Sequence, residues 1–222
     1  MIRGITLART PSPPLYTYPA RPLNGGPLER ARPQPGVWAA EPKWNGWRAL
    51  VHVPSGTLWN RHGKPLTIAP EFESALEILR ATLEAEAFKW VDCEALERRH
   101  GIGRGTLIVL DVIPAPGAYR DHTPPSYAER RAWLTPLPVP TLTEVKSHTV
   151  YLTPSTFDAS RPTLPPFPRP DICWGQCRAA NAQLGAPLYE GVVMKRVDSL
   201  YPIQLRSAEE TTPAWVKHRW RF

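Results

Sequence analysis

Lys43 is the first residue of this sequence whose type and surroundings could do chemistry. It lies in the stretch EPKWNGWR, residues 41–48, where Pro42 and Gly46 punctuate the backbone on either side. We therefore expect Lys43 on a short, rigid connection that leads into a strand. A lysine amine has a pKa of about 10.4 and becomes a nucleophile when burial or nearby cations lower that value. The ordinary alternative is a solvated surface lysine, so other cations must converge on Lys43 for chemistry to follow.

Further charged residues lie on or beside predicted strands. The segments that carry them are residues 60–64 with Arg61, 90–96 with Asp92 and Glu94, 190–195 with Glu190 and Lys195, and 215–219 with Lys217 and Arg219. Since side chains alternate along a strand, the carboxylates at positions 92 and 94 point to the same face. A pocket of cations and a few carboxylates suits a nucleoside triphosphate with a divalent metal, because cations bind the phosphates and carboxylates bind the metal.

The elements that must position these residues are mostly strands. Apolar and β-branched runs predict strands at residues 47–53, 57–61, 90–96, 106–113, 191–195 and 215–220, with the first two joined in a hairpin. Helical periodicity predicts helices at residues 70–88, 127–134 and 173–184, the second with an exposed Arg130–Arg131 pair. Residues 135–170 are Pro-rich and are expected to form loops with short strands. This order indicates an α+β domain built on antiparallel sheets.

The composition favours a basic protein with a polyanionic partner. The 222 residues carry a formal net charge of +7, and the pI is about 9.6, which suits nucleic acid first. Residues 1–35 are rich in Pro, Arg and Gly, and we interpret them as an extended arm lying over one domain of residues 36–222. No apolar run is long enough to cross a membrane, and the N-terminus lacks a signal-peptide pattern, so a cytoplasmic protein is expected.

The three cysteines point to a reducing compartment, because their number is odd and no secretory segment is present. Cys173 and Cys177 are spaced to share one helix face. A structural zinc site would need four ligands, and no His pair at a suitable spacing completes one. We therefore expect buried structural thiols.

Six segments, taken in order, resemble the motifs of the adenylylation domain of ATP-dependent DNA ligases. This domain belongs to the covalent nucleotidyltransferase superfamily, which also contains RNA ligases and mRNA-capping guanylyltransferases. Residues 41–48 are similar to its Lys-x-Asp-Gly motif with a following Arg, and residues 215–219 to its Trp-x-Lys-x-Lys motif. The other matching segments are residues 58–64 (an arginine before a Gly turn), 91–96 (Asp-Gly-Glu-Leu), 107–113 (Phe-Asp-Leu/Val-Leu) and 190–201 (the fourth motif). One such pattern is weak, but six in family order are a strong signal.

The resemblance covers about residues 34 to 220 and implies a fold of two packed, largely antiparallel β-sheets flanked by helices. It also implies the chemistry. Lys43 would attack the α-phosphate of ATP and form a lysyl-AMP phosphoramidate while pyrophosphate leaves. Lys195 and Lys217 would flank the α-phosphate and stabilise the developing charge. Glu94 would accept hydrogen bonds from the ribose hydroxyls.

The resemblance implies a metal and further nucleotide contacts as well. Glu190 would bind Mg²⁺ or Mn²⁺, with Asp92 nearby, and Arg48 and Arg61 would hold the ribose, the phosphates or a nucleic-acid end. The remaining nucleotide-binding residues implied are Glu41, Pro42, Leu110 and Arg219. For the carboxylates at positions 92, 94 and 190 the alternative is a set of strand-edge charges paired with local arginines. For Trp215 the alternative is core packing.

Three departures from the family leave alternatives open. Asn45 stands where the family has Asp, as in some RNA ligases, and Leu110 stands where an aromatic residue stacks on the base. The sequence ends three residues after Arg219, where an OB-fold domain would follow, so we expect no OB-fold domain here. Either a partner protein supplies that domain, or the domain works alone, or the sequence is a fragment.

The function expected from the sequence is that of a minimal ATP-dependent polynucleotide ligase that seals nicked DNA. One alternative is an RNA ligase of the same superfamily. Another is a non-catalytic nucleic-acid-binding module that has kept the fold. A weaker alternative is a guanylyltransferase that uses GTP.

Overall fold

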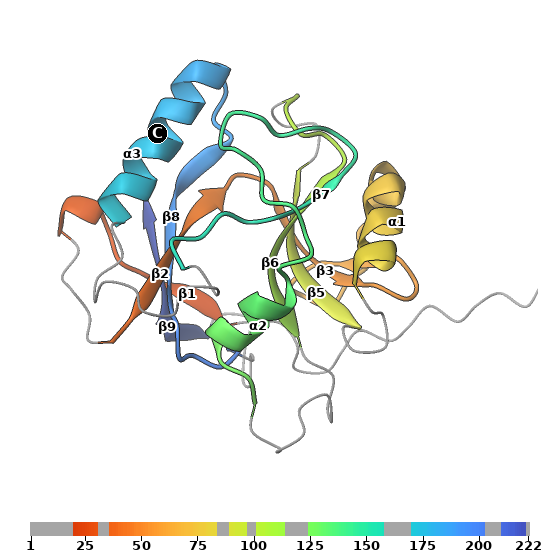
Figure 1. The fold of residues 1–222 in the computed structure, drawn as a ribbon, viewed down its shortest axis with the longest axis horizontal. Coiled ribbons are helices and arrows are strands. Elements are labelled where there is room, and N and C mark those ends of the chain that lie inside the picture. Colours follow the sequence, from red (N-terminus) through yellow and green to blue (C-terminus); the bar gives the residue numbers. More distant parts are fainter. Residues whose placement is uncertain are drawn as a thin grey trace, which may run out of the picture.

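The computed structural model describes residues 20–30, 36–83, 89–96, 101–113, 124–157, 170–202 and 210–220. These residues form two β-sheets with three α-helices around them (Figure 1). The predicted α+β class is confirmed. Within these ranges there is no OB-fold domain. None of the helices described is both long and apolar enough to cross a membrane.

The first sheet has four strands in the order β1-β9-β8-β2. Its strands are β1 (Arg21–Asn24), β2 (Trp38–Trp44), β8 (Tyr189–Arg196) and β9 (Thr211–Arg219). β8 is antiparallel to both β2 and β9, whereas β1 runs parallel to β9 at the edge. Lys43 and Arg219 both lie opposite Gly191 in the register, so β2, β8 and β9 bring charged residues side by side.

The second sheet has five strands in the order β4-β3-β5-β6-β7. Its strands are β3 (Trp47–His52), β4 (Thr57–Trp59), β5 (Trp90–Leu96), β6 (Thr106–Ile113) and β7 (Val150–Leu152). All neighbours are antiparallel except β6 and β7. Arg48 lies opposite Glu94 in the register. The side chains of Arg48, Asp92 and Glu94 therefore share one face of this sheet.

α1 (Glu73–Thr82) and α3 (Pro170–Leu184) lie on opposite sides of the molecule (Figure 1). α1 packs its apolar face, with Ala75, Leu76 and Leu79, on the core of the five-stranded sheet. α3 packs on β8 and β2, and its buried residues include Cys173 and Cys177. Both cysteines are free thiols, as predicted. A third cluster, which contains Leu50 of β3 and Trp215 of β9, joins the two sheets.

Two predicted elements are shorter than expected. The helix predicted at residues 70–88 begins as a 3-10 helix, Ala69–Phe72, and α1 ends at Thr82 because Leu83 is extended. The strand predicted at residues 57–61 ends at Trp59, because the Asn60 side chain accepts the backbone N–H groups of His62 and Lys64 and forms a turn. Predictions on residues 1–19, 31–35, 84–88, 97–100 and 158–169 lie outside the described residues.

The prediction of an exposed arginine pair on α2 (Tyr127–Trp133) is wrong, because both side chains are buried. Arg130 forms a double hydrogen bond with Asp111 on β6, at 2.8 and 3.0 Å. Arg131 donates to the carbonyl oxygen of Thr153 at 2.6 Å. The helix faces the sheets with these two arginines, so they are structural cations and not surface charges.

The connection predicted for Lys43 and the arm predicted before it also differ from the structure. Lys43 lies within β2, and the turn that follows is formed by Asn45 and Gly46. A strand holds a side chain more firmly than a loop does, which suits a reacting group. The described part of the arm includes β1, which pairs with β9 as the edge strand of the first sheet. That part of the arm therefore extends the domain.

Candidate active site

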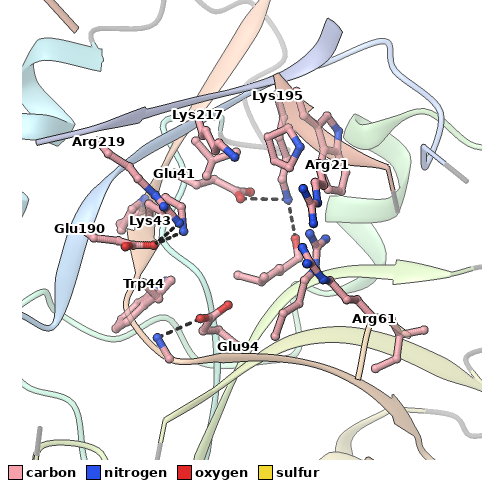
Figure 2. A pocket seen from close by; sticks show the side chains of 18 residues that line it. Arg21, Glu41, Lys43, Trp44, Arg61, Glu94, Glu190, Lys195, Lys217 and Arg219 are labelled. Carbon is pink, nitrogen blue, oxygen red and sulfur yellow. Dashed lines mark hydrogen bonds and ion pairs between the residues drawn. The ribbon is translucent and has the colours of Figure 1, made fainter. Parts of the chain in front are cut away.

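A cavity of about 430 Å³ lies between the two sheets (Figure 2). Its cationic lining residues outnumber its acidic ones. The cations are Arg21, Lys43, Arg48, Arg61, Lys195, Lys217 and Arg219, and the acids are Glu41, Glu94 and Glu190. An excess of fixed cations around one cavity favours a polyanionic ligand. Every residue that the sequence proposed for the site lines this cavity except Asp92.

Lys43 and Arg219 share one carboxylate. Lys43 Nζ forms an ion pair with Glu190 Oε1, and Arg219 Nη2 donates to the same oxygen at 2.9 Å. The close approach of β8 to β9 at Gly191 makes this possible, since a Cβ there would lie 1.9 Å from the carbonyl oxygen of His218. One carboxylate faces two cations here, so the group keeps a net positive charge.

Lys217 is the third cation of this group, and its pKa is lowered. Partial burial is the largest cause, followed by repulsion from Arg219 and Lys43. Glu190 opposes these effects and does not overcome them. A lysine in this state is held among like charges, which an anion such as a phosphate would relieve.

Glu94 faces the cavity from β5 and is anchored at the turn after Lys43. Its Oε1 accepts the backbone N–H of Gly46 at 2.9 Å. A Cβ at Gly46 would lie 2.6 Å from the carbonyl oxygen of Ala95, so only glycine lets the turn approach β5 this closely. Burial raises the pKa of Glu94 to about 7, although Lys43, the Gly46 N–H and Arg48 oppose the shift.

Lys195 lies at a closed part of the cavity and is 2% exposed. Its Nζ donates to Glu41 Oε2 at 2.9 Å and to the carbonyl oxygen of Leu110 at 2.8 Å, and it lies 4.6 Å from the ring centroid of Trp215. The other oxygen of Glu41 accepts the Tyr127 hydroxyl at 2.6 Å. Lys195 is therefore held by its own carboxylate, apart from the cations gathered at Glu190 (Figure 2).

Asp92 lies beneath the cavity and is fully buried. Both of its carboxylate oxygens accept hydrogen bonds from Arg48, and Tyr201 donates to one of them at 3.1 Å. This is the pairing with a local arginine that the sequence left open for Asp92. Its lone pairs are directed at protein donors, which leaves Glu190 as the carboxylate of the predicted metal pair that faces the cavity.

The two departures from the family motifs occupy different positions. Leu110 lines the cavity, where Pro42, Val193 and Trp215 are further apolar lining residues. Asn45 does not line it. Its Nδ2 donates to the carbonyl oxygen of Pro187 at 2.9 Å, a bond that an ionised aspartate could not make. The amide at this position therefore ties the end of β2 to the segment before β8.

Of the lining residues that the sequence did not propose, which include Leu50 and Val193, Arg21 and Pro22 lie on β1. They precede the first recognisable motif by about twenty residues and lie in a Pro-rich stretch without periodicity. The only signal for them was a basic residue in a short segment that can form an edge strand. Nothing in that segment indicates which strand it joins.

The residues present fit a divalent cation only if a bound substrate supplies most of the oxygen atoms that coordinate the ion. No group of three or more His, Cys, Asp or Glu side chains that could hold a metal occurs among the described residues. Magnesium in proteins is commonly bound through one or two carboxylates together with substrate phosphates. Glu190 is suited to provide one carboxylate to such an ion.

Comparisons with known proteins match the fold of this chain but not its sequence. No family model matches the chain, and no curated protein sequence matches it. Solved structures do match. The structure named Pmar-Lig_Pre is 15% identical with a TM-score of 0.54, over 90% of this chain and 46% of that one.

Two other structures are similar at lower scores. Mycobacterial DNA ligase D, complexed with ATP and MES, is 21% identical with a TM-score of 0.46, over 90% of this chain and 60% of that one. Chlorella virus DNA ligase-adenylate is 14% identical with a TM-score of 0.48, over 90% and 68%. The structural neighbours are ligase nucleotidyltransferase domains, and this chain shares their fold. The chain spans about half the length of the first of these structures.

Proposed function

We propose that this protein is an ATP-dependent polynucleotide ligase that adenylylates itself on Lys43. The observation that carries the proposal is the convergence of Lys43, Lys217 and Arg219 on one cavity that also contains the carboxylates of Glu94 and Glu190. A merely cationic binding surface does not need a partly buried lysine on a strand next to two further cations. The ligase nucleotidyltransferase fold is consistent with this chemistry.

In the first step, the neutral amine of Lys43 attacks the α-phosphorus of ATP in line with the leaving group. A P–N bond forms, the P–O bond to the β-phosphate breaks, and pyrophosphate leaves with its electron pair. The Lys43 ammonium gives up two protons in all, which pass to pyrophosphate and water. Lys217 and Arg219 neutralise the charge that develops on the phosphoryl oxygens, and this positioning supplies most of the catalysis.

The nucleoside would be held by the walls of the two sheets. The carboxylate of Glu94 accepts hydrogen bonds from the ribose hydroxyls, beside the Gly46 N–H that already orients it. Aliphatic side chains, Leu110 and Val193, offer a surface for the base in place of an aromatic stack. The buried pair of Lys195 with Glu41 keeps the wall next to the base rigid.

A divalent cation would be held by Glu190 together with phosphate oxygens of the nucleotide. It would supply Lewis-acid stabilisation of the phosphates. Glu190 pairs with Lys43 in this structure, so engaging a metal would weaken its hold on that amine. Lys43 is then free to approach the α-phosphorus.

In the later steps, AMP passes to the 5′-phosphate of a nucleic acid, and a 3′-hydroxyl displaces it to seal the break. We propose nicked DNA as the substrate because the residues of most of the matching motifs resemble those of DNA ligases. RNA remains the alternative substrate. Arg61 and Arg219 are exposed cations next to the cavity and would contact the nucleic-acid backbone. A partner protein that supplies an OB-like domain would complete the grip on the duplex.

The test is intact mass after incubation with Mg²⁺ and either ATP or GTP, for the wild type, Lys43→Ala and the exposed-lysine control Lys89→Ala. The expected result is a gain of one AMP from ATP in the wild type and control only, followed by sealing of nicked DNA. A GMP adduct would make the protein a guanylyltransferase. Sealing of RNA alone would make it an RNA ligase. A folded wild type with no adduct, which still binds DNA in a salt-sensitive way, would be a binding module.

A further inference from the structure

Arg21 is a cavity residue that lies outside every segment resembling a ligase motif. It belongs to β1, and it lines the cavity together with the cations of β2, β8 and β9. It also contributes to the repulsion that lowers the pKa of Lys217, so its charge is felt at the centre of the cation group. A residue in this position acts on whatever anion the cavity holds.

The backbone fixes β1 where it lies. Ala20 N–H donates to the carbonyl oxygen of Pro202 at 2.8 Å, and Arg21 N–H donates to that of Glu210 at 2.7 Å. Gly25 N–H donates to the carbonyl oxygen of Lys217 at 3.0 Å. Hydrogen bonds at both ends of this short strand fix its backbone, so Arg21 extends from an ordered edge strand and not from a loose arm.

The geometry of in-line displacement gives Arg21 a specific task. A nucleophile and its leaving group lie on opposite sides of the phosphorus. In the view of Figure 2, Lys43 and Glu190 lie on one side of the cavity, while Arg21 and Arg61 lie on the other. A nucleotide attacked by Lys43 from that side would direct its leaving phosphates toward the two arginines.

We propose that Arg21 binds the pyrophosphate portion of the nucleotide, facing Arg61 in the turn after β4. The guanidinium of arginine matches a phosphate with two parallel N–H groups, so the two residues would form a clamp between the edge strand β1 and this turn. This inference rests on the proposed function for its identification of the anion. The strand that carries Arg21, β1, lies outside every segment that resembles a ligase motif.

The first experiment measures the binding of inorganic pyrophosphate and of AMP, each with Mg²⁺, by titration calorimetry. It compares the wild type, Arg21→Ala, Arg21→Lys and the exposed-arginine control Arg178→Ala. Arg21→Ala is expected to weaken pyrophosphate binding about tenfold or more, because the substitution removes a charge-assisted hydrogen-bond donor to the phosphates. Arg21→Lys should lie between, and the control should match the wild type. AMP binding should change less than about twofold, since AMP lacks the leaving phosphates.

The second experiment runs the first step in reverse. Adenylylated protein is mixed with pyrophosphate, and ATP release is followed for the same variants. Arg21→Ala should raise the half-saturating pyrophosphate concentration about tenfold or more, while the melting temperature stays within about 2 °C of the wild type.

The outcomes separate this inference from the proposed function. Unchanged pyrophosphate binding in Arg21→Ala would overturn the inference even if the lysyl-AMP adduct forms. Equal weakening of AMP and pyrophosphate binding would also overturn it, because that pattern indicates a general structural role for β1. Loss of pyrophosphate binding in a protein that never forms an adduct would support the pyrophosphate site while rejecting the ligase chemistry.

Discussion

Two lysine–glutamate pairs line the same cavity and differ in almost every physical respect. The side chains of Lys195 and Glu41 are 3% and 2% exposed, and protein groups complete their hydrogen bonds. Lys43 and Glu190 are 17% and 14% exposed, and Glu190 is shared with Arg219. An ion pair that is buried with all its hydrogen bonds made to protein groups suits a structural role. An ion pair that is partly exposed, with two cations sharing one carboxylate, suits the binding of an anionic ligand.

The environment, and not the residue type, decides between these roles. Lys43 lies on β2, and Lys195 lies on the neighbouring strand β8. The resemblance to ligases implied that Lys195 and Lys217 would flank the same phosphate. The structure holds Lys195 against Leu110 and Trp215 and leaves Lys217 among like charges. Breaking each pair in turn is therefore the way to test the comparison.

The largest effect is expected from Lys195→Met, which leaves Glu41 buried without its closest cation. The free energy of unfolding should fall by about 3–5 kcal/mol, because an uncompensated buried charge is costly. Lys43→Met should lower it by less than about 1 kcal/mol, since that pair is partly exposed. Chemical denaturation measures both, and the double variant Glu41→Gln/Lys195→Met should recover part of the loss. Equal effects of the two single variants would erase the distinction between the pairs.

The next effect concerns Lys217→Ala. The rate of adduct formation should fall about 100-fold, because one preorganised charge next to the reacting phosphate is removed. Stability should change little or rise, since the variant relieves repulsion from Arg219 and Lys43. Quenched-flow labelling gives the rate, with Lys89→Ala as the exposed control. A rate within threefold of the wild type would show that Lys217 does not serve the reaction.

A smaller effect, dependent on pH, is expected from Glu94→Gln. Burial raises the pKa of Glu94 from 4.5 to about 7 in the folded protein. The stability this group contributes is therefore fully present below pH 4.5 and is lost as the pH rises through 7. At pH 8 the variant should melt about 2–4 °C above the wild type, and at pH 4.5 the difference should vanish. Calorimetry at both pH values checks this. A variant that melts lower at pH 8 would contradict the sign of the shift.

The smallest effect is expected from Asn45→Asp, which restores the acid of the family motif. The variant loses the hydrogen bond to Pro187 and should unfold about 0.5–1.5 kcal/mol more easily. Adduct formation should stay within about threefold of the wild type, because this side chain does not line the cavity. A tenfold gain in rate would mean that the acid belongs to the chemistry after all.

Local patterns predicted several of the strands but not β1 and β2. The bounds of β5 and β6 were predicted to the residue, and the segments predicted to carry Lys43, Glu94 and Glu190 line one cavity. These features depend on short stretches whose periodicity or residue types determine their own placement. The solved structures confirm the fold they indicated.

Features that depend on distant partners could not be predicted. Arg130 was expected to be exposed, yet it pairs with Asp111 from another element. The resemblance to ligases placed Asp92 near the metal, but Arg48 on the adjacent strand donates to both of its carboxylate oxygens. Arg21 was missed because its strand pairs with the far end of the chain.

Lys43 is tested most directly as the nucleophile by mapping the AMP group with peptide mass spectrometry after incubation with ATP and Mg²⁺. AMP is expected on the peptide that contains Lys43 and not on peptides that contain Lys195 or Lys217. AMP on either of those two lysines would contradict the assignment of the nucleophile. A folded protein that carries no AMP on any peptide would contradict the proposed reaction itself.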